Sequence, residues 1–326
     1  MRFRNALRVL LHNFKNIYVI LLFRLAVFLV VGSIVALIVF SGVGSLLESQ
    51  AAADFVLSLQ KIVKAFFDST SYAEFDGALK AAIEGVVGSF GGVLAFLNQH
   101  LLEIIFSVIG IVALYLVDRF LNGMAHFALG GVLNDKMSQY ADTPFFIGFF
   151  NNVGGAAIYQ IVYVPLAFAY DVVMLALCYL IFFRLFFFLP VLVSLFFAVT
   201  FIIVTQAIKL ALVSDWMPAV IADGKKLSKA IQESFSMGAK SFGVHFSNYL
   251  VAIYCILALN TVFALTSFFS SLLITIPASQ LFITCLQFVS YYTAKNKRYF
   301  LTYTHICQGG SLESVLNQNQ SNGYEE

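Results

Sequence analysis

Long apolar runs alternate with shorter polar segments along this chain. A helix needs about 20 predominantly apolar residues to cross the hydrocarbon core of a bilayer. Six runs come close to this length, at residues 17–40, 101–117, 164–183, 186–208, 247–268 and 272–293. The pattern predicts an all-α, polytopic membrane protein with about six transmembrane helices. The second run is short and could extend in either direction.

The third run is preceded by more apolar sequence, which makes residues 144–183 too long for one span. Asn151, Gly154 and Pro165 interrupt this block. Because proline is tolerated in the first turn of a helix, we expect the span to begin near Pro165. Residues 144–164 are then predicted to form an interfacial or re-entrant piece.

The basic side chains predict an orientation, since lysines and arginines that flank spans are retained on the cytoplasmic side. With the N-terminus inside, fourteen of them are cytoplasmic: Arg2, Arg4, Arg8, Lys15, Arg119, Lys136, Lys209, Lys225, Lys226, Lys229, Lys240, Lys295, Lys297 and Arg298. Four are external: Lys61, Lys64, Lys80 and Arg184. We therefore expect a multi-pass protein of the plasma membrane with both termini in the cytoplasm. Residues 1–298 form one membrane domain in this interpretation, and 299–326 form a polar, disordered cytoplasmic tail.

Three segments outside the spans have helical periodicity. Residues 1–16 place Phe3, Leu7, Leu10 and Phe14 at helical spacing among basic residues, which predicts a helix lying in the interface. It could sense lipid or dock a partner, or it could be an ordinary basic flank of the first span, which we favour.

The helical spacing of apolar residues in 46–100 predicts an extracytoplasmic helical hairpin with a turn at 68–71. In its second arm, Gly88 and Gly92 have the small-residue spacing that permits close helix packing. The hairpin could cap the bundle, bind a partner or act as a gate.

Residues 214–243 predict a cytoplasmic amphipathic helix after a turn at Asp223 and Gly224. Its basic side chains, together with those of the N-terminal helix, are candidates for contact with anionic lipid headgroups. These candidate lipid-surface residues are Arg2, Arg4, Arg8, Lys225, Lys226 and Lys229.

Composition agrees with the pattern, because 60% of the residues are hydrophobic and only 11% are charged. The sequence has no P-loop, dinucleotide glycine fingerprint or G-x-S-x-G motif, and its histidines are not spaced as metal ligands. The basic residues flank spans instead of forming a surface for nucleic acid. We therefore expect no enzymatic activity, no cofactor and no nucleic-acid partner.

Two charges lie inside the apolar runs, Arg24 in the first and Asp171 in the third. An unpaired ion inside a bilayer costs about 2.5–3.5 kcal/mol on insertion scales, so a partner is expected. Both residues lie roughly 10 Å from the inner boundary, at a rise of about 1.5 Å per residue, and they could meet. Asp171 held by Arg24 could be a proton or cation site, or the pair could only fix the helix register, which we favour.

A resemblance to a known group appears between residues 219 and 235. Residues 219–224, which read AVIADG, are followed by Leu227, Ser228, Lys229, Ala230, Ile231, Ser234 and Phe235. This stretch resembles the cytoplasmic loop of a broad group of poorly characterised bacterial membrane proteins, similar to the membrane domain of some glycerophosphodiester phosphodiesterases. The resemblance covers residues 214–243 and the order of spans, and it implies a bacterial membrane protein. It does not carry over the enzymatic activity, because the acids and histidines of that metal site have no counterpart here.

Two functions are compatible with the sequence. The first is a noncatalytic accessory or scaffold protein of a bacterial cell envelope, with the lipid bilayer and a membrane protein as its partners. The alternative is a small-solute or lipid transporter that uses the Arg24 and Asp171 region.

Overall fold

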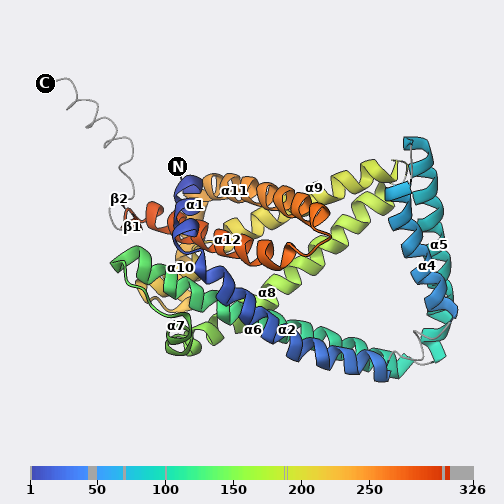
Figure 1. Cartoon of the computed structure of the whole chain (residues 1–326), viewed down its shortest axis with the longest axis horizontal. Helices are drawn as coiled ribbons and strands as arrows, with labels where there is room; N and C mark the ends of the chain where they lie inside the picture. The colour runs from blue at the N-terminus through green and yellow to red at the C-terminus, as the bar shows by residue number, and fades with distance from the viewer. Residues whose placement is uncertain are drawn as a thin grey trace, which may run out of the picture. The chain divides into compact units, whose positions relative to one another are not determined.

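The computed structural model describes residues 2–42, 50–68, 71–99, 101–186, 188, 190–302 and 305–308. These residues are almost entirely helical, and six helical segments are long and apolar enough to cross a membrane (Figure 1). The six segments are Lys15–Phe40, Ile105–Gln139, Val153–Leu185, Val191–Asp223, Phe242–Thr266 and Leu272–Ala294. The predicted all-α, polytopic fold is confirmed.

The helices and strands follow one another in the order shown by the colours of Figure 1. The first six helices are α1 (Arg2–His12), α2 (Lys15–Gly42), α4 (Gln50–Asp68), α5 (Tyr72–Gln99), α6 (Leu101–Gln139) and α7 (Phe145–Asn151). They are followed by α8 (Val153–Tyr179), the π-helical turn η1 (Leu180–Leu185), α9 (Val191–Val213), α10 (Trp216–Asp223), α11 (Leu227–Thr266) and α12 (Leu272–Ala294). Two short antiparallel strands, β1 (Arg298–Thr302) and β2 (His305–Gln308), end the described chain.

The chain divides into two compact units. Unit 1 comprises Met1–Ala26, Phe120–Ala169 and Ile203–Glu326, and unit 2 comprises Val27–Arg119 and Tyr170–Ile202. Long helices therefore contribute residues to both units.

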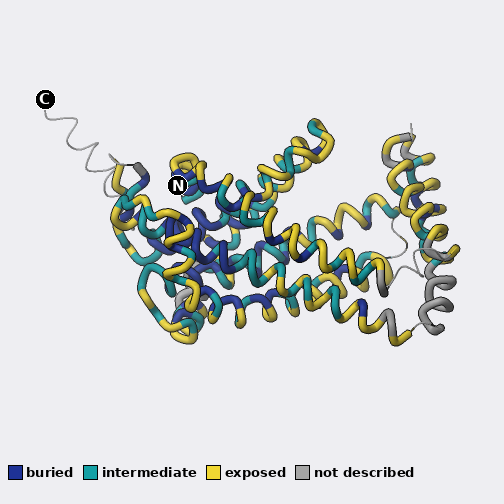
Figure 2. Tube along the Cα trace, turned by 60° about the horizontal axis from the view of Figure 1, so that its bottom comes forward, coloured by how far each residue is buried: buried dark blue, intermediate teal, exposed yellow. Residues whose placement is uncertain are grey.

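Unit 1 contains a dense core centred on α12. Leu281, Cys285, Leu286, Phe288 and Val289 of this helix are fully buried, as expected for a helix that is apolar on every side. Buried residues of α1, α6, α10 and α11 pack into the same core, which is dark blue near the N-terminus in Figure 2.

Helix α6 packs closely in this core at Gly130. A Cβ atom at this position would lie 2.9 Å from Ile221 and 3.1 Å from Phe288. Any side chain here would therefore have to displace its neighbours.

Unit 2 contains the hairpin formed by α4 and α5. The two helices pack against one another through buried Ser58, Ala65, Leu79 and Ala82. Gly85 allows the close approach, because a Cβ atom there would lie 3.0 Å from the Ser58 hydroxyl. By contrast, a Cβ atom at Gly88 would have no neighbour within 4 Å. On the described part of α5 the close helix contact is therefore at Gly85 and not at Gly88, and the surroundings of Gly92 lie outside what the structure describes.

Three details of the prediction were wrong. Pro165 lies inside α8 and not in its first turn, because the helix already begins at Val153 after the short helix α7. The amphipathic helix of residues 214–243 is not a separate element, because α11 continues without a break from Leu227 to Thr266.

The third correction concerns the beginning of the polar tail, where Arg298–Thr302 and His305–Gln308 pair as antiparallel strands. Tyr299 and Leu301 are only 2% and 4% exposed, and the Asn5 amide of α1 donates a 3.0 Å hydrogen bond to the Tyr299 hydroxyl. Burial of these two side chains orders a segment whose composition alone favours disorder. Residues 309–326 of the predicted tail lie outside the described residues.

Candidate functional site

Two helix ends in unit 1 bring together charged residues that lie far apart in the sequence. Helix α10 ends at Asp223, and Gly224 takes the left-handed conformation, with a φ of 62°, that reverses the chain toward α11. Helix α12 ends at Ala294 in a similar way, and Asn296 takes the left-handed conformation with a φ of 54°. There the amide of Lys297 donates a 2.9 Å hydrogen bond to the carbonyl of Tyr292, as in a Schellman motif.

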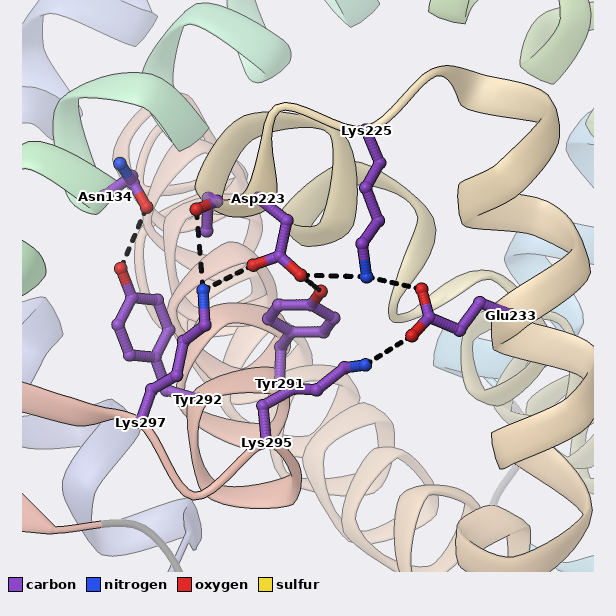
Figure 3. Close-up of polar contacts among 9 residues, drawn as sticks. Asn134, Asp223, Lys225, Glu233, Tyr291, Tyr292, Lys295 and Lys297 are labelled. Atoms are coloured by element: carbon purple, nitrogen blue, oxygen red, sulfur yellow. Dashed lines mark hydrogen bonds and ion pairs between the residues drawn. The ribbon is translucent and has the colours of Figure 1, made fainter.

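Asp223 lies at the centre of the resulting ion-pair cluster (Figure 3). Its Oδ1 accepts a hydrogen bond from Lys297. Its Oδ2 accepts a 2.8 Å hydrogen bond from the Tyr291 hydroxyl and lies 3.0 Å from the ammonium of Lys225. We use the name ion-pair cluster for Asp223, Lys225, Glu233, Lys295 and Lys297.

Glu233 of α11 completes the ion-pair cluster. One of its oxygens accepts a hydrogen bond from Lys225, and the other accepts a 2.6 Å hydrogen bond from Lys295. These two hydrogen bonds lower the pKa of Glu233. The pKa of Lys225 is raised by its hydrogen bonds to Glu233 and Asp223. The lysines and carboxylates are thus charged at neutral pH and bound to one another.

The ion-pair cluster fastens the α10–α11 connection to the end of α12. Beside it, the Tyr292 hydroxyl donates a 2.9 Å hydrogen bond to Asn134 of α6, which attaches a third helix (Figure 3). The carboxylates of Asp223 and Glu233 already accept hydrogen bonds from lysines, so this arrangement is a clamp and not an open metal site. Among the residues that the structure describes, no group of three or more histidine, cysteine, aspartate or glutamate side chains is placed to hold a metal ion.

The structure separates the candidate lipid-surface residues into two sets. Arg4, Arg8, Lys226 and Lys229 are exposed, as a surface for anionic headgroups requires. Arg2 is half-buried near Asp215, and Lys225 belongs to the ion-pair cluster. Contact of these residues with lipid stays a prediction, although Lys225 is already bound to Asp223 and Glu233.

Asp171 has an ion-pair partner within unit 2. Its Oδ2 lies 3.6 Å from a guanidinium nitrogen of Arg119, whose side chain also lies over the ring of Tyr115 at 5.2 Å. Arg24 belongs to unit 1, where its charge is close enough to interact with His126. The predicted pair of Arg24 and Asp171 stays a prediction.

Sequence reasoning missed Arg119 and the ion-pair cluster for the same reason. Arg119 was expected in a cytoplasmic segment, because the apolar run ends near residue 117, but α6 continues to Gln139. Lys295 and Lys297 were assigned only to the basic flank of the last span. In the sequence, Gly224 and the Lys-Asn-Lys segment at 295–297 are signals of two helix ends, although they do not say that these ends meet.

The fold and the exposed apolar surface define the class of this molecule as an integral, multi-pass helical membrane protein. Large side chains of α2 illustrate this, because Leu22, Phe28, Leu37 and Phe40 are between 66% and 76% exposed and require a bilayer as solvent. No protein-family model, curated protein or solved structure matches the chain.

Proposed function

We propose that this chain is a noncatalytic accessory protein of a bacterial cell envelope, and that it binds a partner membrane protein through the α4–α5 hairpin. The proposal places the protein in the plasma membrane with both termini in the cytoplasm and the hairpin outside. The distribution of lysines and arginines supports this orientation. The resemblance of residues 219–235 to bacterial membrane proteins supports the origin.

The observation that carries the proposal is a groove of about 460 Å³ on the hairpin. Four alanines and three charged residues line it: Ala65, Ala78, Ala81, Ala82, Lys61, Lys64 and Glu74. Ala65 and Ala82 are buried between α4 and α5 and form the floor of the groove, whereas Ala78 and Ala81 are exposed. Small exposed side chains let another helix approach closely. Two lysines against one glutamate give the groove a positive charge. It therefore fits an apolar helical segment of a partner that carries acidic residues.

Site-specific photocrosslinking in living cells tests this surface. A photoreactive residue at Ala78 lies in the groove, whereas one at Lys80 points away from it, because two positions along a helix turn by roughly 200°. We expect one adduct of defined mass from Ala78 and none from Lys80. The charge reversals Lys61→Glu and Lys64→Glu should together reduce the adduct about tenfold or more, which corresponds to about 1.4 kcal/mol.

The matched control is the reversal Lys80→Glu, which leaves the groove unchanged and should leave the adduct unchanged. Crosslinking from Ala78 to lipid alone would count against a protein partner. An adduct that survives reversal of both groove lysines would remove the electrostatic basis of the proposal.

The transporter alternative depends on Asp171, and its ion pair with Arg119 favours a role in helix register. Asp171→Asn should abolish solute flux in proteoliposomes if Asp171 carries a proton or cation. If Asp171→Asn only lowers thermal stability, and exchanging the charges of Asp171 and Arg119 restores it, the pair is structural and the alternative fails.

A further inference from the structure

A second group of charged and polar side chains lies inside unit 1, behind the ion-pair cluster. Asp215 follows the end of α9 and is only 4% exposed, and His245 of α11 is only 1% exposed. The hydroxyl of Ser214, itself 1% exposed, lies 3.4 Å from Oδ1 of Asp215 and 3.5 Å from Nδ1 of His245. The same hydroxyl donates to the carbonyl oxygen of Ala211 at 3.2 Å, so a carboxylate, an imidazole and a backbone carbonyl surround one buried hydroxyl.

The other nitrogen of this imidazole is unusual. Nε2 of His245 is buried and has no hydrogen-bond partner in the described protein. Most buried polar side-chain atoms have a partner, so an exception in a titratable group calls for an explanation. Reversible protonation is one explanation for the unpartnered Nε2, because a neutral imidazole has one acceptor nitrogen, whereas both nitrogens of an imidazolium are donors.

A small cavity connects Asp215 with the polar surface. Its volume is about 10 Å³, which is roughly the space that one water molecule needs. It is lined by Asp215, Ala219, Ala230, Glu233, Ser234, Tyr291 and Lys295. Glu233 and Lys295 are 35% and 20% exposed at their side chains, so the cavity extends from the partly solvated ion-pair cluster to the buried carboxylate.

Charged groups and neutral tyrosines from several helices surround the Asp215–His245 pair. The groups close enough for electrostatic interaction are Arg2 of α1, Tyr249 of α11, Tyr291 of α12 and Lys295 after α12, with Glu233 across the cavity. Arg2 and Lys295 stabilise an anionic Asp215, and Arg2 also opposes a cationic His245. Burial penalises charge on both members of the pair. The protonation state of the pair is therefore set by opposing effects, which is the situation in which a small change of pH can alter it.

We propose that Asp215 and His245 together form a proton-binding site, which exchanges its proton with water through the cavity beneath Glu233 and Lys295. Uptake transfers one H⁺ from a hydronium ion to the pair: one O–H bond of the hydronium breaks, one bond to the pair forms, and water is left. The added positive charge repels Arg2 and Lys295, and α1 carries Arg2. Proton binding is thus linked to the attachment of the N-terminal helix. This site is separate from the groove on the α4–α5 hairpin and stands whether or not the groove binds a partner.

Solid-state NMR of histidine-labelled protein in lipid nanodiscs tests the proposal directly. The signals of His245, assigned by their loss in His245→Gln, report the protonation of both ring nitrogens. In the wild type we expect one protonation change as the pH is lowered from about 8 to about 5, the range in which histidine titrates. In Asp215→Asn the midpoint should move down by one pH unit or more, because the anionic neighbour that favours imidazolium is absent.

Asp142→Asn is the matched control, because it removes an exposed carboxylate of unit 1 that is bound to Lys136, and it should leave the midpoint unchanged. If Asp215→Asn does not fold, infrared spectra of the wild type decide the question by showing whether a carboxylic acid forms over the same range. A wild type in which neither the imidazole nor a carboxylate changes between about pH 8 and 5 would overturn the proposal. So would an unaltered midpoint in a folded Asp215→Asn protein.

Discussion

The ion-pair cluster predicts a large effect of Asp223→Asn, a substitution that preserves shape and removes one charge. The asparagine can still accept a hydrogen bond from Lys297 through Oδ1. Its amide NH₂ then faces Lys225 and the Tyr291 hydroxyl, which donate to Oδ2 in the wild type. Two lysines are left without their central anion.

The magnitude follows from burial. The Asp223 side chain is 14% exposed, and those of Lys225 and Lys297 are 27% and 35% exposed. Fully exposed ion pairs contribute about 0.2–1 kcal/mol, and removing one partner of a fully buried pair costs about 3–5 kcal/mol. For this intermediate case we expect a loss of about 1–3 kcal/mol, or roughly 5- to 150-fold in the unfolding equilibrium.

The chain supplies its own probe for this measurement. Trp216 is the only tryptophan in the sequence, and it lies on α10 at 5% exposure, 6.3 Å from the ring of Phe235. Its fluorescence should therefore follow the release of α10 during denaturant unfolding in nanodiscs. Lys297→Met combined with Asp223→Asn should be non-additive by at least about 0.5 kcal/mol, because the two side chains interact directly.

Lys229→Gln is the control, since this lysine is exposed on the first turns of α11. The reasoning fails if Asp223→Asn costs no more than Lys229→Gln. It also fails if the effects of Asp223→Asn and Lys297→Met simply add.

Three further predictions concern unit 1. The lowered pKa of Glu233 stabilises the fold above its unfolded pKa of about 4.3, and this stabilisation is lost as the pH falls through the folded pKa. The raised pKa of Lys225 stabilises the fold below its unfolded pKa of about 10.4, and this stabilisation is lost as the pH rises through the folded pKa. Thermal unfolding should thus show a plateau between these limits, and Glu233→Gln should flatten its acidic side. Gly130→Ala should destabilise unit 1 by about 1–3 kcal/mol in the same fluorescence assay, whereas Gly155→Ala, whose Cβ would meet only ordinary contacts at 3.9 Å, should not. Asn5→Ala should cost about 1–3 kcal/mol by leaving a buried hydroxyl without its donor, and limited proteolysis should then cut near α1 at lower protease concentration.

The sequence predicted the spans because their signal is local. An apolar run of about 20 residues identifies a membrane helix without reference to any other part of the chain. Helix ends were less accurate, as Pro165 shows, because a proline inside a membrane helix is tolerated when neighbouring groups satisfy the freed carbonyl.

The contacts between helices depend on long-range packing, which periodicity does not report. Asp223 and Lys297 are 74 positions apart, and Asp215 lies between α9 and α10 whereas His245 lies in α11. The local sequence around Asp223 suggests only a turn, that around Lys297 only a basic flank, and His245 only a scattered histidine. Their pairing follows from the fold, in which the ends of α10 and α12 meet.

The unbroken course of α11 has a mechanical consequence. Its 40 residues span about 60 Å at a rise of about 1.5 Å per residue, from the ion-pair cluster through the fifth membrane span to Thr266. A continuous helix has no loop within it at which to bend freely, so a tilt or rotation imposed near Glu233 also moves the end of α11 at Thr266. The ion-pair cluster at the start of α11 and the α11–α12 turn at its end are therefore mechanically coupled.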